Sequence, residues 1–142
     1  MGRVSYAEGE GLAKDINEAI NWYRKAAEQG IVEAQENLGY LYLKGDRVPK
    51  DRTEAAKWYR KAAEQGVAID QNMLGLFYIK GDGIPKNTVE GLAWCILAAD
   101  SGDVKIVEMR DKRITELGPE VTQAARERSL RLKKEIETAK RR

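Results

Sequence analysis

The sequence predicts an all-α solenoid of antiparallel helix hairpins that ends in a C-terminal capping helix. The segment WYRKAAEQG occurs at Trp22–Gly30 and again 36 residues later at Trp58–Gly66. A fainter copy follows after another 36 residues, at Trp94–Gly102. A fixed period of this length is typical of stacked repeats, in which each unit buries its apolar face only against its neighbours.

The first helix of the repeat is clearest after residue 31. Ala34, Leu38 and Tyr42 lie at i, i+4 and i+8, which is one face of an α-helix. Gly45 follows this face directly and Gly81 follows the equivalent face one period later, so both are expected to be left-handed C-caps. Glycine also recurs inside the helix, at Gly39 and Gly75, where it costs about 1 kcal/mol relative to alanine. We therefore expect a partner helix to approach closely there.

The second helix of the repeat is predicted by a capping box, an N-cap residue followed three positions later by glutamate. Between residues 15–30 and 51–66, 12 of 16 positions are identical, whereas only 5 of 16 match between 51–66 and 87–102, so the third copy has diverged. The pattern predicts three second helices, each beginning at a capping box. The three boxes are Asp15–Glu18, Asp51–Glu54 and Asn87–Glu90.

The period fails after Gly102, because Arg110 and Asp111 stand where Leu-Gly would recur. We predict a capping helix over Val104–Leu117, ended by Gly118, and a last helix over Pro119–Lys140. The predicted divisions of one continuous domain are a truncated first repeat (1–30), two full repeats (31–66 and 67–102) and a C-terminal helical cap (103–142). The apolar stripe of the last helix comprises Val121, Ala125, Leu132, Ile136 and Ala139.

The pattern A-x-x-x-L-G-x-x-Y, G-x-x-V-P-x-D, A-x-x-W-Y-x-K-A-A-x-x-G resembles the Sel-one-like repeat, a subgroup of the tetratricopeptide superfamily. The first repeat lacks most of its first helix, because Tyr6 already aligns with Tyr42. The resemblance implies a right-handed superhelix and a non-catalytic adaptor, of the kind found in bacterial signalling, envelope or host-contact systems and in eukaryotic protein quality control. The matching residues are Ala34, Leu38, Gly39, Tyr42, Gly45, Val48, Pro49, Asp51, Ala55, Trp58, Tyr59, Lys61, Ala62, Ala63 and Gly66.

By analogy with the tetratricopeptide groove, the resemblance places the partner-binding surface on the first helices, facing the concave side. An apolar centre with a rim of glutamate and lysine suits a peptide or a partner helix. The alternative is that the C-terminal helix folds back and fills this groove. The expected groove residues are Glu33, Glu36, Tyr40, Leu43, Lys44, Ile69, Asn72, Leu76, Ile79 and Lys80.

The absence of histidine excludes Ser-His-Asp and Cys-His nucleophilic sites and histidine-ligated metal sites. Cys95 is the only cysteine, so it forms no intramolecular disulfide and no thiolate zinc site. Some cysteine-rich bacterial relatives are linked to β-lactam binding, but their paired cysteines are absent here. No nucleotide-binding glycine motif is present. The sequence favours a protein that is not an enzyme and has no cofactor or metal.

The formal net charge is only +2, and no apolar stretch reaches the length of a membrane span. Residues 119–142 are basic, with eight Lys/Arg and four Asp/Glu, and we expect them to form the solvated outer face of a terminal cap. The alternative is a basic contact for an acidic partner or nucleic acid, which the four acidic residues and the absence of aromatic residues disfavour. The predicted location is the cytoplasm, for the chain as given.

Three tryptophans share one repeat position, Trp22, Trp58 and Trp94, and we expect them to pack in the core rather than form a ligand cage. Cys95 replaces a tyrosine and is expected to pack as a small apolar residue. Asp70 replaces the small Ala34 near a helix start, where its charge suits the helix dipole or, alternatively, marks the mouth of the groove.

The truncated first repeat also predicts a weak homodimer at this end of the array, since a repeat cannot bury its face alone. Self-assembly is therefore a third functional alternative, beside the adaptor and the hydrolase. The residues expected to lack cover are Ile16, Ala19, Ile20 and Tyr23.

Overall fold

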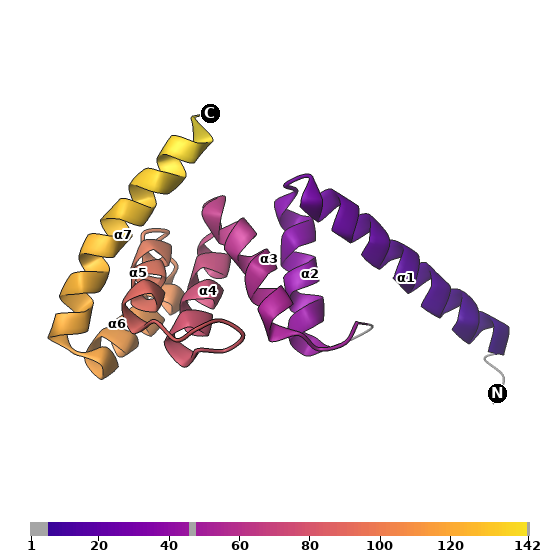
Figure 1. The fold of residues 1–142 in the computed structure, drawn as a ribbon, viewed down its shortest axis with the longest axis horizontal. Coiled ribbons are helices and arrows are strands. Elements are labelled where there is room, and N and C mark those ends of the chain that lie inside the picture. Colours follow the sequence, from indigo (N-terminus) through magenta and orange to yellow (C-terminus); the bar gives the residue numbers. More distant parts are fainter. Residues whose placement is uncertain (1–5, 46–47, 142) are drawn as a thin grey trace.

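The structure, a computed structural model, describes residues 6–45 and 48–141, and this part of the chain contains seven helices and no strand. The helices follow one another in a row from one end of the molecule to the other (Figure 1). The predicted all-α repeat solenoid is confirmed. The helices are α1 (Tyr6–Glu28), α2 (Val32–Lys44), α3 (Arg52–Glu64), α4 (Ala68–Lys80), α5 (Thr88–Ala99), α6 (Val104–Leu117) and α7 (Pro119–Lys140).

The two complete hairpins, α2–α3 and α4–α5, begin and end where the sequence predicts. Gly45 and Gly81 cap α2 and α4 with φ of 70° and 68°, the left-handed region that glycine adopts without strain. The Asp51 carboxylate accepts a hydrogen bond from the Glu54 amide at 3.0 Å. The Asn87 side chain does the same for the Glu90 amide. Each of these caps satisfies an amide that the helix itself leaves unpaired.

The third predicted helix start, at Asp15, is wrong, because α1 continues through it from Tyr6 to Glu28. In the other repeats the loop before the second helix contains Pro49 or Pro85, and the equivalent residue here is Ala13. Proline cannot continue a helix, whereas alanine is the best helix former. Without the proline, the two helices of the first repeat merge into one.

Helices do approach closely at the two interior glycines. A Cβ atom on Gly39 would lie 3.1 Å from the Tyr59 ring. The crossing at Gly75 is tighter, because a Cβ there would lie 2.6 Å from both the Cys95 sulfur and the Gly91 carbonyl oxygen. Cys95 is fully buried at this crossing, which confirms that it packs as a small apolar residue.

The tryptophans separate into two groups. Trp58 and Trp94 are 3% and 2% exposed, so their predicted core role is confirmed. Trp58 packs against residues of the preceding helix pair, among them Ala27 of α1 and Leu38 of α2. Trp22 is 68% exposed, and for this residue the core prediction is wrong. The equivalent neighbours do not exist beside α1 within the described residues, so the same side chain faces solvent.

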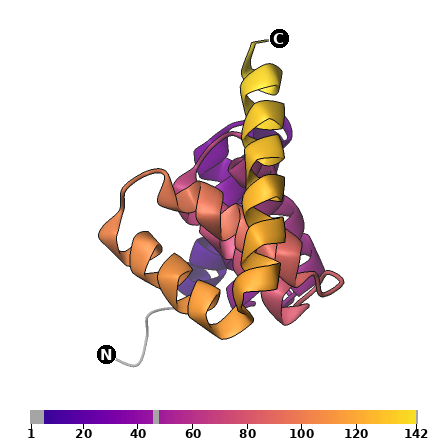
Figure 2. The ribbon, with the colours of Figure 1, turned by 90° about the vertical axis from the view of Figure 1, so that its left-hand side faces the viewer.

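Both predicted C-terminal helices form with the expected bounds. Ala125, Leu132 and Ile136 of α7 are buried in the same cluster as Leu92 and Trp94 of α5. Figure 2, viewed along the array, shows α6 and α7 at this end of the molecule. The alternative in which the last helix fills the groove between first helices is therefore wrong, because α7 packs mainly on α5, a second helix.

Candidate partner-binding groove

α6 lies where the first helix of a fourth repeat would lie. In the preceding repeats an arginine of one hairpin donates a hydrogen bond to a tyrosine hydroxyl of the next first helix. One period later both partners are isoleucines, and both pack against one core cluster. The repeat geometry thus continues although its polar contact is replaced by an apolar one. The three pairs are Arg24–Tyr42, Arg60–Tyr78 and Ile96–Ile114.

The first turn of α6 is held by an N-cap hydrogen bond and by the burial of one apolar side chain. The Asp103 carboxylate accepts a hydrogen bond from the Ile106 amide at 3.1 Å, and Ile106 is buried against Ala98 and Ala99. Arg110 and Asp111, which break the repeat pattern, pair with each other at 2.9 Å. They are tolerated because α7 packs on α5 and makes few contacts with α6, so no tight hairpin crossing forms at that point.

Two hollows lie between α4 and α6, and Met109 of α6, 42% exposed, lines both. Their volumes are about 610 and 350 Å³. Together they form what we call the α4–α6 groove. Its α4 wall comprises Ala68, Ile69, Asn72, Leu76, Ile79 and Lys80, and its α6 wall comprises Lys105, Ile106, Met109, Lys112, Arg113, Glu116 and Leu117, with Ser101, Gly102 and Asp103 at one end.

The five groove residues expected on α4 all line this groove, although their exposure differs. Ile69 is 59% exposed, and Leu76 and Ile79 are half-buried. Asn72 is buried because α6 covers it, and its side-chain amide donates to the Met109 sulfur at 3.3 Å while its oxygen accepts from Arg113 at 3.4 Å. Lys80 is exposed at the far end.

The five residues expected on α2 do not line this groove, because α2 is the first helix of the preceding hairpin. Glu33 and Lys44 are exposed, Glu36 and Leu43 are half-buried, and Tyr40 is 54% exposed with the Lys44 ammonium 5.7 Å from its ring centre. Leu43 packs against the core cluster that contains Tyr59 and is not free for a partner. The ten residues are thus divided between the groove and a neighbouring surface on α2.

The α6 wall is the part of the site that sequence reasoning missed. The loss of Leu-Gly at residues 110–111 was interpreted as the end of the repeat, so no groove residue was expected on α6. The available signal was the apolar residue at the next repeat position, Ile114 at the place of Tyr78. It indicates that α6 still packs as a first helix and can therefore face α4.

Asp70 is 2% exposed and lies beside Glu36 of α2 rather than at a groove mouth. Burial, followed by the charge of Glu36 and a hydrogen bond with its carboxyl group, raises the pKa of Asp70 to about 8. One of its oxygens, Oδ2, has no hydrogen-bond partner among the described residues. The nearby Tyr59 pKa rises to about 12, mainly by burial and then by the charge of Asp70. At neutral pH the Asp70 carboxyl group is therefore protonated.

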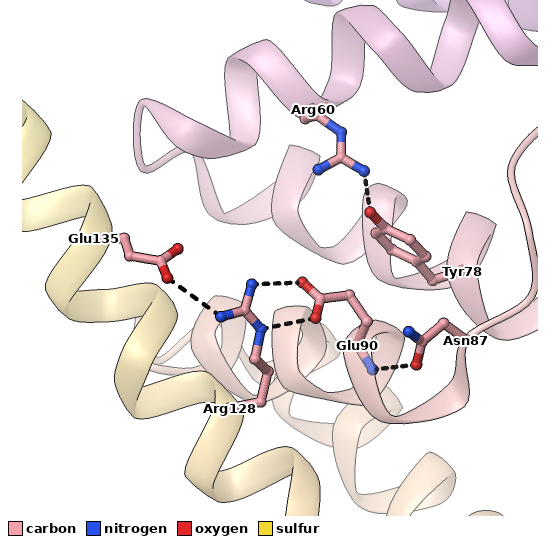
Figure 3. Close-up of polar contacts among 6 residues, drawn as sticks. All are labelled: Arg60, Tyr78, Asn87, Glu90, Arg128 and Glu135. Carbon is pink, nitrogen blue, oxygen red and sulfur yellow. Dashed lines mark hydrogen bonds and ion pairs between the residues drawn. The ribbon is translucent and has the colours of Figure 1, made fainter.

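Another hollow, of about 170 Å³, lies between α3, α5 and α7, and a charged network borders it (Figure 3). Arg128 of α7 donates to both carboxylate oxygens of Glu90, at 2.8 and 3.1 Å, and to Glu135 at 3.3 Å. The hydrogen bond with Glu90 is the main cause that raises the pKa of Arg128. The charges pair with one another, so this network holds α7 on α5.

Burial raises the pKa of the Cys95 thiol to about 11, although Arg113 opposes the shift, so the thiol is protonated at neutral pH. Within residues 6–45 and 48–141, no group of three or more Cys, Asp or Glu side chains is placed to bind a metal ion. No helix in that same part of the chain is long and apolar enough to cross a membrane.

The comparisons with known proteins agree with this architecture. The sequence model of a family described as Sel1 repeat matches three segments, residues 1–31, 32–67 and 68–103. The chain belongs to the Sel1 repeat family. No curated protein matches the chain. Sel1 repeat proteins are generally scaffolds for protein interactions.

Two solved structures are similar to this Sel1 repeat chain. The protein c5321, described as a protective antigen of uropathogenic Escherichia coli strains with an SLR fold, is 36% identical, with 83% of this chain covered and a TM-score of 0.77. A Sel1 repeat protein from Oxalobacter formigenes is 48% identical over 62% of this chain, with a TM-score of 0.59. This chain covers only 26% and 36% of their lengths.

Proposed function

We propose that this chain is a non-catalytic scaffold that binds a polypeptide segment in the α4–α6 groove. The observation that carries the proposal is the groove itself, a hollow between two adjacent first helices with Ile69 and Met109 exposed along it. Exposed apolar side chains grouped in a hollow and surrounded by charges are typical of protein interaction sites. The general role of the family as an interaction scaffold supports the same function.

Ile69 and Leu130 offer a matched pair for testing the groove. Both are exposed apolar side chains in helices, 59% and 68% exposed, but Leu130 lies on α7 outside the groove. A photoreactive residue at position 69 should crosslink a partner in the native cells, and one at position 130 should not. Ile69→Asp should abolish capture and Leu130→Asp should leave it unchanged, with equal melting temperatures. Equal capture by both variants would contradict binding in the groove.

The absence of catalysis is part of the same proposal. The chain contains no histidine, and its single thiol is buried with a raised pKa, so the usual nucleophile and base pairs cannot form. A panel of hydrolase substrates that includes β-lactams should show no turnover above buffer. Turnover that persists through repurification and is lost on one point substitution would show an enzyme. The cytoplasmic location also remains a prediction.

The exposed face of α1 favours a second role, a weak homodimer. Trp22 and Tyr23 are 68% and 39% exposed, whereas the equivalent Trp58 and Tyr59 are 3% and 6% exposed. Ile16 and Ile20, which the sequence predicted to lack cover, instead pack towards α2. The face that a second copy would bury is therefore centred on Trp22, and a two-fold contact closes the assembly without polymerisation.

Sedimentation velocity at increasing concentration tests the dimer. The parent chain should show a rising mass, and Trp22→Glu should stay monomeric. Leu130→Glu is the control, because it adds the same charge on an exposed position of α7. A parent chain that remains monomeric at every concentration would remove the dimer.

A further inference from the structure

The α4 side of the α4–α6 groove carries three apolar side chains, with the polar Asn72 between the first and the second. Ile69, Leu76 and Ile79 stand at i, i+7 and i+10 on α4, which places them on one helical stripe about 15 Å long. Met109 faces them from the middle of α6. α6 has 14 residues, so the groove is about 21 Å long. A partner helix of about ten to fourteen residues would fill it.

The rim of the groove is basic. Four basic side chains line it, Lys80, Lys105, Lys112 and Arg113, against two acidic ones, Asp103 and Glu116, which gives a net charge of +2. The Asp103 carboxylate is already engaged with the Ile106 amide. Among the described residues, none of the three lysines has a carboxylate within ion-pair distance. Their charges are available to a partner.

The neighbouring surface on α2 carries Glu33 and Glu36 against one cation, Lys44, which gives it a net charge of −1. The rim therefore carries as much net positive charge as the whole chain, which has a formal net charge of only +2. A net positive charge around an apolar floor favours a partner of the opposite charge and speeds its association.

We propose that the α4–α6 groove binds an acidic amphipathic helix of the partner protein, an inference that rests on the scaffold function proposed above. Leucine-like side chains at i, i+3 or i+4 and i+7 contact Ile69, Leu76 and Met109. Carboxylates on the flanks of the helix pair with the rim. Lys105 and Lys112 are seven residues apart on α6, two helical turns, so glutamates with the same spacing on a parallel helix meet both.

Fluorescence anisotropy with three synthetic peptides of about sixteen residues tests this proposal. The first has leucines at helical spacing and glutamates on both flanks, the second has lysine in place of every glutamate, and the third is the first with a central proline. The acidic peptide should bind at least about tenfold more tightly than the basic one. Its binding should weaken as salt rises, because rim charges are screened. The proline peptide should bind more weakly, since proline breaks the helix.

Two variants with the same change in net charge test whether the preference for the acidic peptide comes from the rim of the groove. Lys105→Glu with Lys112→Glu changes two exposed positions of the rim, and should reverse the preference towards the basic peptide. Arg131→Glu with Lys134→Glu makes the same change in net charge on exposed positions of α7, outside the groove, and should leave the preference unchanged. Circular dichroism and melting temperature establish that both variants fold.

The outcomes separate this inference from the scaffold function. Acidic and basic peptides that bind equally, and that both lose binding in Ile69→Asp, would overturn the acidic partner and leave the scaffold standing. Equal binding by the proline peptide would overturn the helical partner. Binding by none of the three peptides would overturn the inference as well, and the crosslinking at position 69 then decides the scaffold independently.

Discussion

The N-terminal and C-terminal halves of this array differ in how they relate to the repeat pattern. The N-terminal half keeps the segment WYRKAAEQG unchanged in both copies, yet it leaves Trp22 exposed at its end. The C-terminal half departs from the pattern at Asp70 and Cys95, yet α7 closes it with buried apolar residues. The repeat signature therefore specifies the helix hairpin, whereas the burial of a given side chain depends on the neighbouring unit. A residue's role in such an array is set by what lies beside it.

The largest effect expected from this difference is at the shared tryptophan position. Trp58→Ala removes a side chain that is 3% exposed and should lower the free energy of unfolding by about 3–5 kcal/mol. Trp22→Ala removes one that is 68% exposed and should change it by less than about 0.5 kcal/mol. Urea unfolding at low protein concentration, where any dimer is dissociated, measures both. Equal losses would contradict the open N-terminal end.

The second prediction concerns Asp70, which stands one period after Ala34 at the same repeat position. The folded chain keeps a proton on Asp70 up to about pH 8, whereas the unfolded chain releases it near the ordinary value of 3.8. The unfolded state thus binds fewer protons in this window. The free energy of unfolding should fall as pH rises from about 4 to about 8, by up to about 1.4 kcal/mol per pH unit, and then level off.

Asp70→Asn keeps the shape of the side chain without its charge and should remove most of this slope. Glu36→Gln removes only the second cause of the raised pKa and leaves burial in place, so it should reduce the slope less. Urea unfolding at several pH values between 4 and 9 measures the slopes. An unchanged slope in Asp70→Asn would place the titrating group elsewhere.

The third prediction compares the two interior glycines. Gly75→Ala places a Cβ 2.6 Å from the Gly91 carbonyl oxygen, which is backbone and cannot move easily, so it should cost about 1–3 kcal/mol. Gly39→Ala meets only the Tyr59 ring at 3.1 Å, and alanine's better helix propensity offsets part of that cost. The melting temperature should fall clearly for the first variant and by less for the second. The reverse order would show that the crossing at Gly39 is the tighter one.

Much of the fold could be predicted because the repeat carries local signals. The caps at Asp51 and Asn87 and the glycines that end α2 and α4 act within a few residues, so the sequence displays them directly. The continuous α1 was missed because it depends on a proline that is absent, at Ala13.

The groove was harder to predict because it depends on contacts between helices. Its α4 wall follows from the repeat analogy, since Glu33 and Tyr40, which stand one period before Ile69 and Leu76, are exposed. Its α6 wall depends on α6 packing as a first helix, which rests on the contact of Ile114 with the core cluster. The burial of Asn72 under α6 is a consequence of that packing and has no local signal.

Arg128, which helps to hold α7 on α5, has one carboxylate partner that is mostly buried and one that is exposed. Arg128→Ala leaves the Glu90 carboxylate, whose side chain is 16% exposed, without its two hydrogen bonds, and should cost about 2 kcal/mol. Glu135→Ala removes a partner that is 62% exposed, where water screens the charge, and should cost less than about 0.5 kcal/mol. Hydrogen exchange should then show faster opening of α7 in Arg128→Ala, with protection of α2 and α3 unchanged, because each unit of a stacked array depends mainly on its neighbours. Faster exchange throughout the chain would show instead that the array unfolds as a whole, and that closure at one end stabilises the open end as well.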